Sequence, residues 1–138
     1  MMKESGYSST PLARKLGIKE NFKVKLVNPP DYYFQLFSDF PDNVQIVTDT
    51  KSKKDFIHLF VVDAVTLTKE LVPLKNQLEL NGALWVSWYK KSSKVSTDVT
   101  DEVIRNLALK HGLVDVKVCA VDEVWSGLKL VIPIKDRK

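Results

Sequence analysis

The feature that most constrains the fold is a nearly unbroken apolar run at residues 56–62. A run of this length, interrupted only by His58, is typical of a parallel strand whose two faces are both covered. Three further β-rich segments, residues 22–27, 44–48 and 83–89, lie around it in the chain. The sequence therefore predicts a central sheet that is buried between layers of helices.

Helical patterns alternate with these strands. Leucines at residues 67, 71, 74 and 78 lie on one face of a predicted helix over residues 67–80, in which Pro73 should produce a kink and after which Asn81-Gly82 should end it. Thr100 is a good N-cap for a second helix that ends at Gly112. Shorter helices are expected to begin at the hydroxyl residues before Pro11 and at Asp31.

The last part of the chain predicts an antiparallel hairpin, formed by residues 114–121 and 128–134. Together these patterns predict a single α/β domain over residues 1–138. It is a three-layer sandwich with a Rossmann-like sheet of about five or six strands that ends in the hairpin. The link from residues 44–48 to residues 56–62 is too short for an ordinary parallel crossover. The strand at 44–48 is thus either antiparallel to its neighbour or joined to it by an unusually tight extended link.

The turn after the first strand is unusual for a nucleotide-binding protein. There the chain has Asn28-Pro29-Pro30, and it has no glycine between Gly17 and Gly82. A phosphate or adenosyl group is normally cradled by closely spaced glycines, and each proline removes a backbone N–H donor. The sequence predicts that the usual cofactor cradle is missing.

Composition indicates the kind of surface and the cellular compartment to expect. The net charge of +4 is spread along the chain, which is most simply explained as a lysine-rich surface that aids solubility. The one cysteine, Cys119, cannot form an intramolecular disulfide, and no Cys/His spacing indicates a metal site. Residues 1–10 lack the apolar region of a signal peptide, and no segment is long enough to span a membrane. We expect a soluble, cytoplasmic protein.

Two segments resemble the class I S-adenosylmethionine-dependent methyltransferases, in a shortened form. Residues 78–86 are similar to the passage of that superfamily in which a helix ends at a glycine and enters a central strand, and residues 55–59 are similar to the strand before it. The resemblance implies that an acid at the end of the second strand, here Asp49, binds ribose hydroxyls. Two features depart from that pattern: the glycines after the first strand are missing, and the link after the second strand is too short for a helix and a further strand.

The chain more closely resembles an uncharacterised, mostly bacterial family that is known only as a domain of unknown function. Residues 7–12, 16–19, 84–88 and 118–128 carry this resemblance, so it covers almost the whole chain. It implies membership of the family and brings no known activity or catalytic residue with it.

Ligands of open α/β sheets lie beyond the carboxyl ends of the strands. Residues expected at that edge are the ligand-binding candidates: Asn28, Asp49, Asp63, Trp88, Lys90, Lys91, Asp122, Glu123 and Trp125. Each has a plainer alternative, because acids at strand ends and hairpin tips are commonly turn residues. Trp88 or Tyr89 is equally suited to the core, because aromatic residues readily fill such cores.

These observations favour a non-catalytic binding or interaction module that uses no cofactor and recognises an unknown small molecule or protein. The alternative is a minimal methyltransferase that binds S-adenosylmethionine through an unconventional loop, with Asp49 on the ribose. Nucleic-acid binding through the lysines beside Trp88 is disfavoured because arginine is scarce there. His58 lies in the middle of a strand, away from the ligand edge, and is expected to be a hydrogen-bonded core residue.

Overall fold

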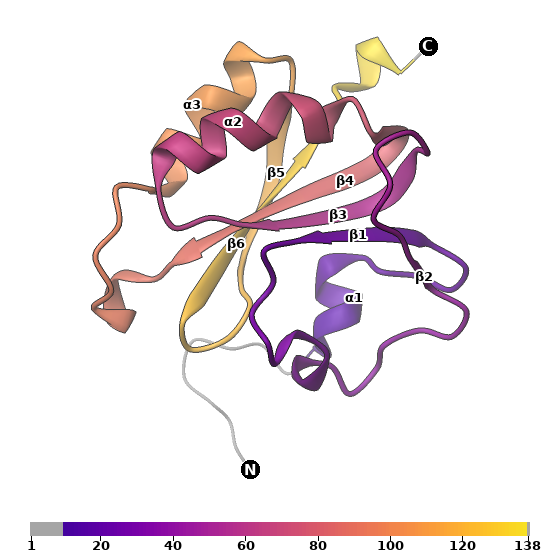
Figure 1. The fold of residues 1–138 in the computed structure, drawn as a ribbon, viewed down its shortest axis with the longest axis horizontal. Coiled ribbons are helices and arrows are strands. Elements are labelled where there is room, and N and C mark those ends of the chain that lie inside the picture. The colour runs from indigo at the N-terminus through magenta and orange to yellow at the C-terminus, as the bar shows by residue number, and fades with distance from the viewer. Residues whose placement is uncertain (1–9, 138) are drawn as a thin grey trace.

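A six-stranded sheet with the order β2-β1-β3-β4-β6-β5 forms the centre of the computed structural model, which describes residues 10–137 (Figure 1). The strands are β1 (Lys23–Val27), β2 (Gln45–Ile46), β3 (Lys54–Phe60), β4 (Leu78–Tyr89), β5 (Val114–Ala120) and β6 (Trp125–Val131). The first four are parallel where they pair, whereas β6 runs antiparallel to both β4 and β5. The predicted α/β sheet with a terminal hairpin is confirmed.

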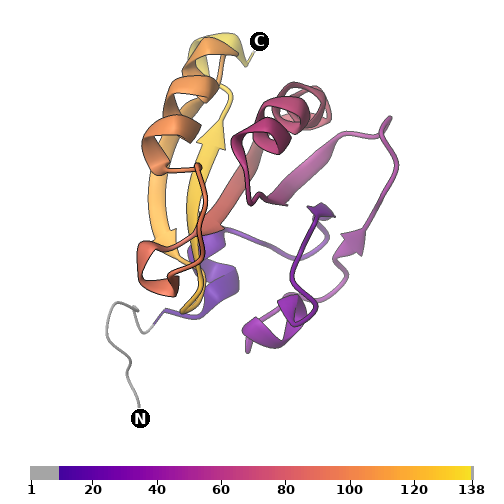
Figure 2. The same ribbon diagram turned by 60° about the vertical axis from the view of Figure 1, so that its left-hand side comes forward.

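Helices cover the sheet on its two faces (Figures 1 and 2). The longer helices, α2 (Ala64–Lys75) and α3 (Asp101–Lys110), pack on one face. The short helix α1 (Leu12–Leu16) and the 3₁₀ helix η1 (Tyr33–Leu36) cover the other. Two further 3₁₀ turns, η2 (Lys91–Ser93) and η3 (Ile134–Asp136), follow β4 and β6.

The apolar run in β3 divides between two cores, as the sequence predicts. Ile57 and Leu59 belong to the core beneath α2 and α3, whereas Phe56 and Phe60 belong to the core beneath α1 and η1. All four side chains are at most 2% exposed. Successive side chains of a strand point to opposite faces, so an almost entirely apolar strand can bury both faces at once.

The two long helices begin where polar side chains accept their first free N–H groups. The Asp63 carboxylate accepts from Thr66 N at 2.7 Å, and Thr100 Oγ1 accepts from Val103 N at 3.1 Å. For α1, by contrast, the hydroxyl cap expected among residues 8–10 lies largely outside the described residues. The N-cap of α1 is Pro11, and the distant Asp39 carboxylate accepts from Ala13 N and Arg14 N at 3.0 and 3.2 Å.

Several predicted elements differ from the observed ones, including the second strand of the hairpin, which is β6 at Trp125–Val131 instead of residues 128–134. The segment after Asp31 forms only the 3₁₀ helix η1. Helix α2 ends at Lys75 instead of residue 80, and β4 already begins at Leu78, so Asn81-Gly82 lies inside a strand. Gly82 is needed there because a Cβ would lie 3.0 Å from the carbonyl oxygens of Lys54 and Asp55 on the neighbouring strand.

Strand β2 resolves the alternative that the sequence leaves open. It is parallel to β1, with Lys23 opposite Gln45, and it does not neighbour β3. The tight extended link, residues 47–53, therefore returns past β1 to the start of β3. Within residues 10–137, no helix has the length and apolar character needed to cross a membrane.

Candidate functional site

The strand order reverses its direction between β1 and β3. From β1 the chain passes to β2 on one side, and it then returns to β3 and β4 on the other. At such a switch point the loops leaving two neighbouring parallel strands diverge, which opens a crevice beyond their carboxyl ends. The start of β6 lies at the same edge, because Trp125 is paired with Tyr89 at the end of β4.

A cavity of about 240 Å³ occupies this switch point. We call it the switch-point cavity. Its lining comes from the ends of β1, β3 and β4, from the first turn of α2 and from the start of β6: Asn28, Pro30, Phe60, Val62, Thr66, Tyr89 and Trp125. Of the residues predicted from the sequence to bind a ligand, it brings together Asn28 and Trp125.

Aromatic rings form one wall of the switch-point cavity. Trp125 stacks on Tyr89, with ring centroids 4.4 Å apart, and meets Phe60 edge-on at 5.0 Å. Trp125 is only 7% exposed, so its ring is fixed by packing. A flat or cationic ligand group would find rigid π surfaces here.

The turn after β1 takes a left-handed conformation at Asn28, where φ is +57°. Asparagine tolerates this region better than most residues with a Cβ, so it makes the turn for which a glycine was expected. Pro29 and Pro30 follow and supply no N–H groups. The backbone at this position therefore turns sharply, but it cannot bind a phosphate or carboxylate through consecutive amides.

The turn between β5 and β6 is held by Asp122. Its Oδ1 accepts from Val124 N and Trp125 N, both at 2.8 Å, so this carboxylate stabilises the turn that positions Trp125. Tyr32 lies nearby, and its pKa is raised, first by burial and then by the Asp122 carboxylate. Glu123 is exposed at the tip of the turn.

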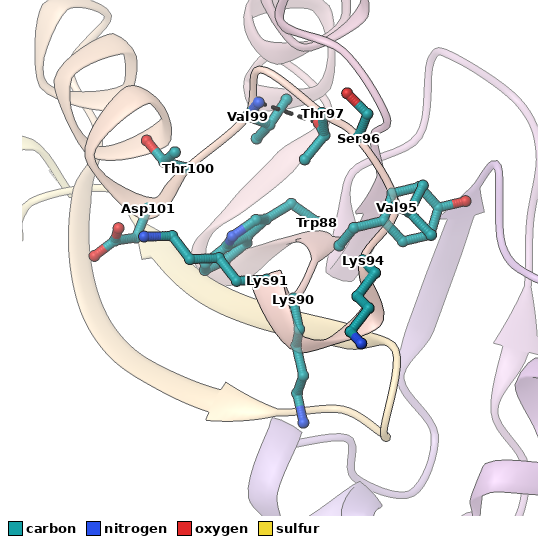
Figure 3. A pocket seen from close by; sticks show the side chains of 11 residues that line it. Trp88, Lys90, Lys91, Lys94, Val95, Ser96, Thr97, Val99, Thr100 and Asp101 are labelled. Atoms are coloured by element: carbon teal, nitrogen blue, oxygen red, sulfur yellow. Dashed lines mark hydrogen bonds between the residues drawn. The ribbon is translucent and has the colours of Figure 1, made fainter.

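A second hollow, of about 390 Å³, lies between the end of β4 and the start of α3 (Figure 3). We call it the lysine hollow. It is lined by Trp88, Tyr89, Lys90, Lys91, Lys94, Val95, Ser96, Thr97, Val99, Thr100 and Asp101. Figure 3 shows the Trp88 indole between the three lysines and the hydroxyl side chains of the loop that leads to α3. Tyr89 lines this hollow and the switch-point cavity alike.

Trp88 itself is 9% exposed and belongs to the core beneath α2 and α3. The alternation of the strand places Trp88 and Tyr89 on opposite faces. Trp88 is thus a core residue that also forms the floor of a hollow. The three sequence-predicted residues Trp88, Lys90 and Lys91 share this site.

Asp49 does not lie at the ligand edge, and this placement corrects the expectation from the sequence. Its carboxylate accepts from Ser52 N at 2.6 Å, Ser52 Oγ at 2.8 Å and Lys51 N at 3.1 Å. These bonds, first among them those from Ser52, lower the pKa of Asp49. The link from β2 turns back so early that Asp49 lies beside Lys54, at the start of β3 and away from the switch point.

Lys54 is fully buried, and we call Lys54 together with its partners Asp49, Ser52 and Gln77 the buried lysine cluster. The Lys54 ammonium donates to Asp49 O at 2.6 Å, Ser52 O at 2.7 Å and Gln77 Oε1 at 3.1 Å. Burial lowers the pKa of Lys54, and Asp49 partly opposes that effect. An ammonium has three N–H groups, and each has an acceptor here, so the cluster has a structural role.

Asp63 is also structural. It caps α2, and the hydrogen bonds from Thr66 lower its pKa. His58 is a fully buried core residue, as predicted: its ring nitrogens bond Tyr33 Oη at 2.9 Å and Ser87 Oγ at 2.7 Å. Burial lowers the pKa of His58 to about 3, so the ring is neutral at physiological pH.

Five lining residues of the switch-point cavity were not singled out as candidates from the sequence: Pro30, Phe60, Val62, Thr66 and Tyr89. Strand alternation could have separated Tyr89 from Trp88, because only one of two successive residues can face a given core. Residues 10–137 contain no group of three or more His, Cys, Asp or Glu side chains placed to hold a metal ion.

Comparison with known proteins gives a likeness of structure without a likeness of sequence. No protein-family model matches the chain, and no curated protein matches its sequence. Among solved structures, a precorrin-6y C5,15-methyltransferase from Geobacter metallireducens GS-15 superposes with a TM-score of 0.59 at 8% identity, covering 88% of this chain and 86% of that one.

Two further solved structures are described with a ligand. Magnesium protoporphyrin IX methyltransferase (ChlM) from Synechocystis PCC 6803, with bound SAM, has a TM-score of 0.57 at 9% identity and covers 88% of this chain and 74% of that one. DhpI in complex with SAH has a TM-score of 0.58 at 9% identity, covering 90% and 83%. The chain therefore has a methyltransferase-like Rossmann fold.

These neighbours correct two expectations from the sequence. We expected a non-catalytic module without a cofactor, because the glycine-rich loop is missing. The solved structures that share the fold include methyltransferases, one with SAM and another protein with SAH.

Proposed function

We propose that this protein is a small methyltransferase that binds S-adenosylmethionine in the switch-point cavity. One observation carries the proposal: a cavity lies where the strand order reverses, at the carboxyl ends of β1 and β3, in a fold shared with solved methyltransferases. Ligands of open α/β sheets bind at this position. The methyl acceptor is a separate molecule.

The lining of the cavity fits the chemistry of this cofactor. S-adenosylmethionine, when bound, supplies an activated methyl group on a positively charged sulfur. Aromatic faces attract cations and stack with flat rings, and the Tyr89, Trp125 and Phe60 rings offer both kinds of contact. Val62 adds apolar surface at the same edge.

The turn after β1 bends as a glycine-rich cofactor loop would, but it offers fewer backbone N–H donors than such a loop. Asn28 makes the left-handed turn, but Pro29 and Pro30 leave polar contacts to side chains. The side chains that line the cavity carry polar groups at Asn28 and Thr66, and also the Tyr89 hydroxyl and the Trp125 indole N–H. At about 240 Å³ the cavity is smaller than the 300 Å³ or more usual for ligand pockets, so it accommodates only part of the cofactor.

Two finer points accompany the proposal. Membership of the uncharacterised bacterial family rests on the four sequence segments that resemble it. A cytoplasmic location accords with the single cysteine: Cys119 is a free, half-buried thiol whose pKa is raised by burial, as suits a structural residue in a reducing compartment.

Calorimetric titration with S-adenosylmethionine and S-adenosylhomocysteine tests the proposal. We expect saturable binding of both, and a ligand at a hundred times its Kd should raise the free energy of unfolding by about 2.7 kcal/mol. Absence of binding at millimolar concentration to the folded protein would contradict the proposal.

Two neighbouring valines provide a matched pair of variants for locating the ligand. Val62 lines the cavity and is 48% exposed, whereas Val65 is 77% exposed and lies outside the lining. Val62→Trp fills the cavity and should weaken S-adenosylhomocysteine binding at least tenfold, a loss of about 1.4 kcal/mol. Val65→Trp should leave the affinity unchanged. Equal affinities for the two variants would exclude the switch-point cavity as the site.

A further inference from the structure

We infer that the lysine hollow binds the methyl acceptor, and that this acceptor is an anion whose phosphate or carboxylate group is attached to a flat apolar body. This inference rests on the proposed function, which it extends to the class of substrate. It draws on three independent features of the hollow: its charge, its floor and its position beside the switch-point cavity.

The charge of the hollow is positive. Lys91 and Lys94 contribute two cations, against the single carboxylate of Asp101, whereas the ammonium of Lys90 points away from the Trp88 indole (Figure 3). That carboxylate is also shared with Arg105, whose Nη1 lies 3.3 Å from Asp101 Oδ2. A concave surface lined by charges of one sign raises the local concentration of the opposite ion. An anionic group is therefore the preferred occupant.

The lysines come from a short, defined segment. Lys90 N donates to Val124 O at 2.8 Å, and Ser93 Oγ donates back to Lys90 O at 2.6 Å, which ties η2 to the hairpin turn. Lys94 closes η2 in a left-handed conformation, with φ of +62°. The backbone that carries the cations is thus anchored to the sheet, and the flexible lysine side chains can adjust to the anion.

The floor of the hollow is apolar. The Trp88 indole is held by the core beneath α3, and Val95 and Val99 flank it (Figure 3). Ser96, Thr97 and Thr100 line the side formed by the loop that leads to α3. A small inorganic ion would leave this apolar surface in contact with water, whereas a ring beside the charged group would cover it.

The hollow lies beside the switch-point cavity, and this position suits a binding site for the methyl acceptor. Tyr89 lines the lysine hollow and the switch-point cavity, so the two sites adjoin at this residue. Methyl transfer requires the acceptor to lie next to the methyl donor. The lysine hollow shares this wall residue with the switch-point cavity and is lined by more cations than carboxylates.

Phenyl phosphate, benzoate and benzyl alcohol are suitable probes, because they combine a ring with a phosphate, a carboxylate or no charge. We expect the two anions to bind and to shift one of the three tryptophan indole N–H signals in NMR spectra, assigned to Trp88 by its loss in Trp88→Phe. Benzyl alcohol should bind at least tenfold more weakly. Comparison of the two anions decides between phosphate and carboxylate.

Two pairs of variants test the location. Lys91→Gln with Lys94→Gln should weaken phenyl phosphate binding about tenfold. The exposed Lys69 and Lys110 lie outside the hollow, and the same double change there should have no effect. Val95→Asp places a carboxylate in the lining of the hollow and should weaken binding, unlike Leu109→Asp at another exposed apolar position. Because Val95 and Leu109 are exposed, both variants should fold.

Equal binding of benzyl alcohol and phenyl phosphate would overturn the inference, as would equal losses in the hollow variants and their controls. Titration of S-adenosylhomocysteine into the same samples separates the two claims. S-adenosylhomocysteine binding without phenyl phosphate binding would overturn only the present inference. Phenyl phosphate binding without S-adenosylhomocysteine binding would remove the proposed function, and with it the acceptor role.

Discussion

The two ends of the parallel strands differ in how their polar side chains are used. At the start of β3, the ammonium of Lys54 has three acceptors, and the Asp49 carboxylate has three N–H or O–H donors. At the opposite edge, Asn28 and Thr66 line a cavity, and lysines surround a hollow. Polar groups that satisfy one another hold the fold together. Polar side chains at the opposite edge line concave surfaces that a ligand can enter.

The largest effect that would distinguish the two ends is on stability. Lys54→Met retains most of the side-chain volume but removes the three hydrogen bonds that the ammonium donates to Asp49 O, Ser52 O and Gln77 Oε1, of which Asp49 O and Gln77 Oε1 keep Lys25 Nζ as a second donor. Three hydrogen bonds from a buried charged group are lost, so we expect the free energy of unfolding to fall by about 3 kcal/mol. Chemical denaturation measures it, with the exposed Lys51→Met as control.

The same variant should leave ligand binding intact. Lys54 lies at the end of β3 opposite to the switch-point cavity, so Lys54→Met, where folded, should bind S-adenosylhomocysteine with unchanged affinity. A large loss of affinity would show that the two ends are coupled and that the contrast between them is false. A fall in stability equal to that of Lys51→Met would show that the buried lysine cluster contributes little.

The next effect is the pH dependence of stability that comes from His58, which lies in the interior between the two ends of the strands. The pKa of His58 is lowered from 6.5 to about 3 by burial, so the folded protein keeps the ring neutral where the unfolded chain takes up a proton. Stability from this group is complete above pH 6.5 and is lost as the pH falls toward 3. Between pH 7 and pH 5 we expect a loss of about 2 kcal/mol.

Denaturation at the two pH values tests this expectation, with His58→Gln as the control. Glutamine does not titrate, so the variant should lose most of the pH dependence whatever its stability at pH 7. If the original protein and His58→Gln lose the same stability between pH 7 and pH 5, the burial of a neutral His58 does not control the pH response.

Much of this fold follows from local signals in the sequence. The apolar run predicts β3 because only a strand covered on both faces needs so many buried residues in succession. Thr100 predicts the start of α3 because its hydroxyl can accept from the N–H three residues later. Such signals act over a few residues, and the surrounding structure has little power to change them.

Predictions failed where tertiary contacts decide between local alternatives. Leu78 continues the leucine spacing of α2, yet it lies in β4, because β3 offers a partner for the strand: Lys54 is paired with Leu78. Asp31 is a suitable cap, but Asn28-Pro29-Pro30 and the packing of Tyr33 against His58 allow only a 3₁₀ turn. At the site, the strand ends predicted Asn28 and Trp125, whereas the partners of Asp49 depend on a return path that spacing does not reveal.

The smallest predicted effect concerns Asp49, which the sequence places at the ligand edge and the structure places at the start of β3. Asp49 was expected to bind ribose only under the alternative, methyltransferase interpretation of the sequence, and in the structure its carboxylate accepts from Ser52 and Lys51. Asp49→Asn keeps the size of the side chain but replaces one acceptor oxygen with a donor, so the exposed turn should be weakened. We expect a smaller fall in Tm than for Lys54→Met, and an S-adenosylhomocysteine affinity within twofold of the original. A tenfold loss of affinity, about 1.4 kcal/mol, would instead return Asp49 to the ligand site and require the link after β2 to rearrange on binding.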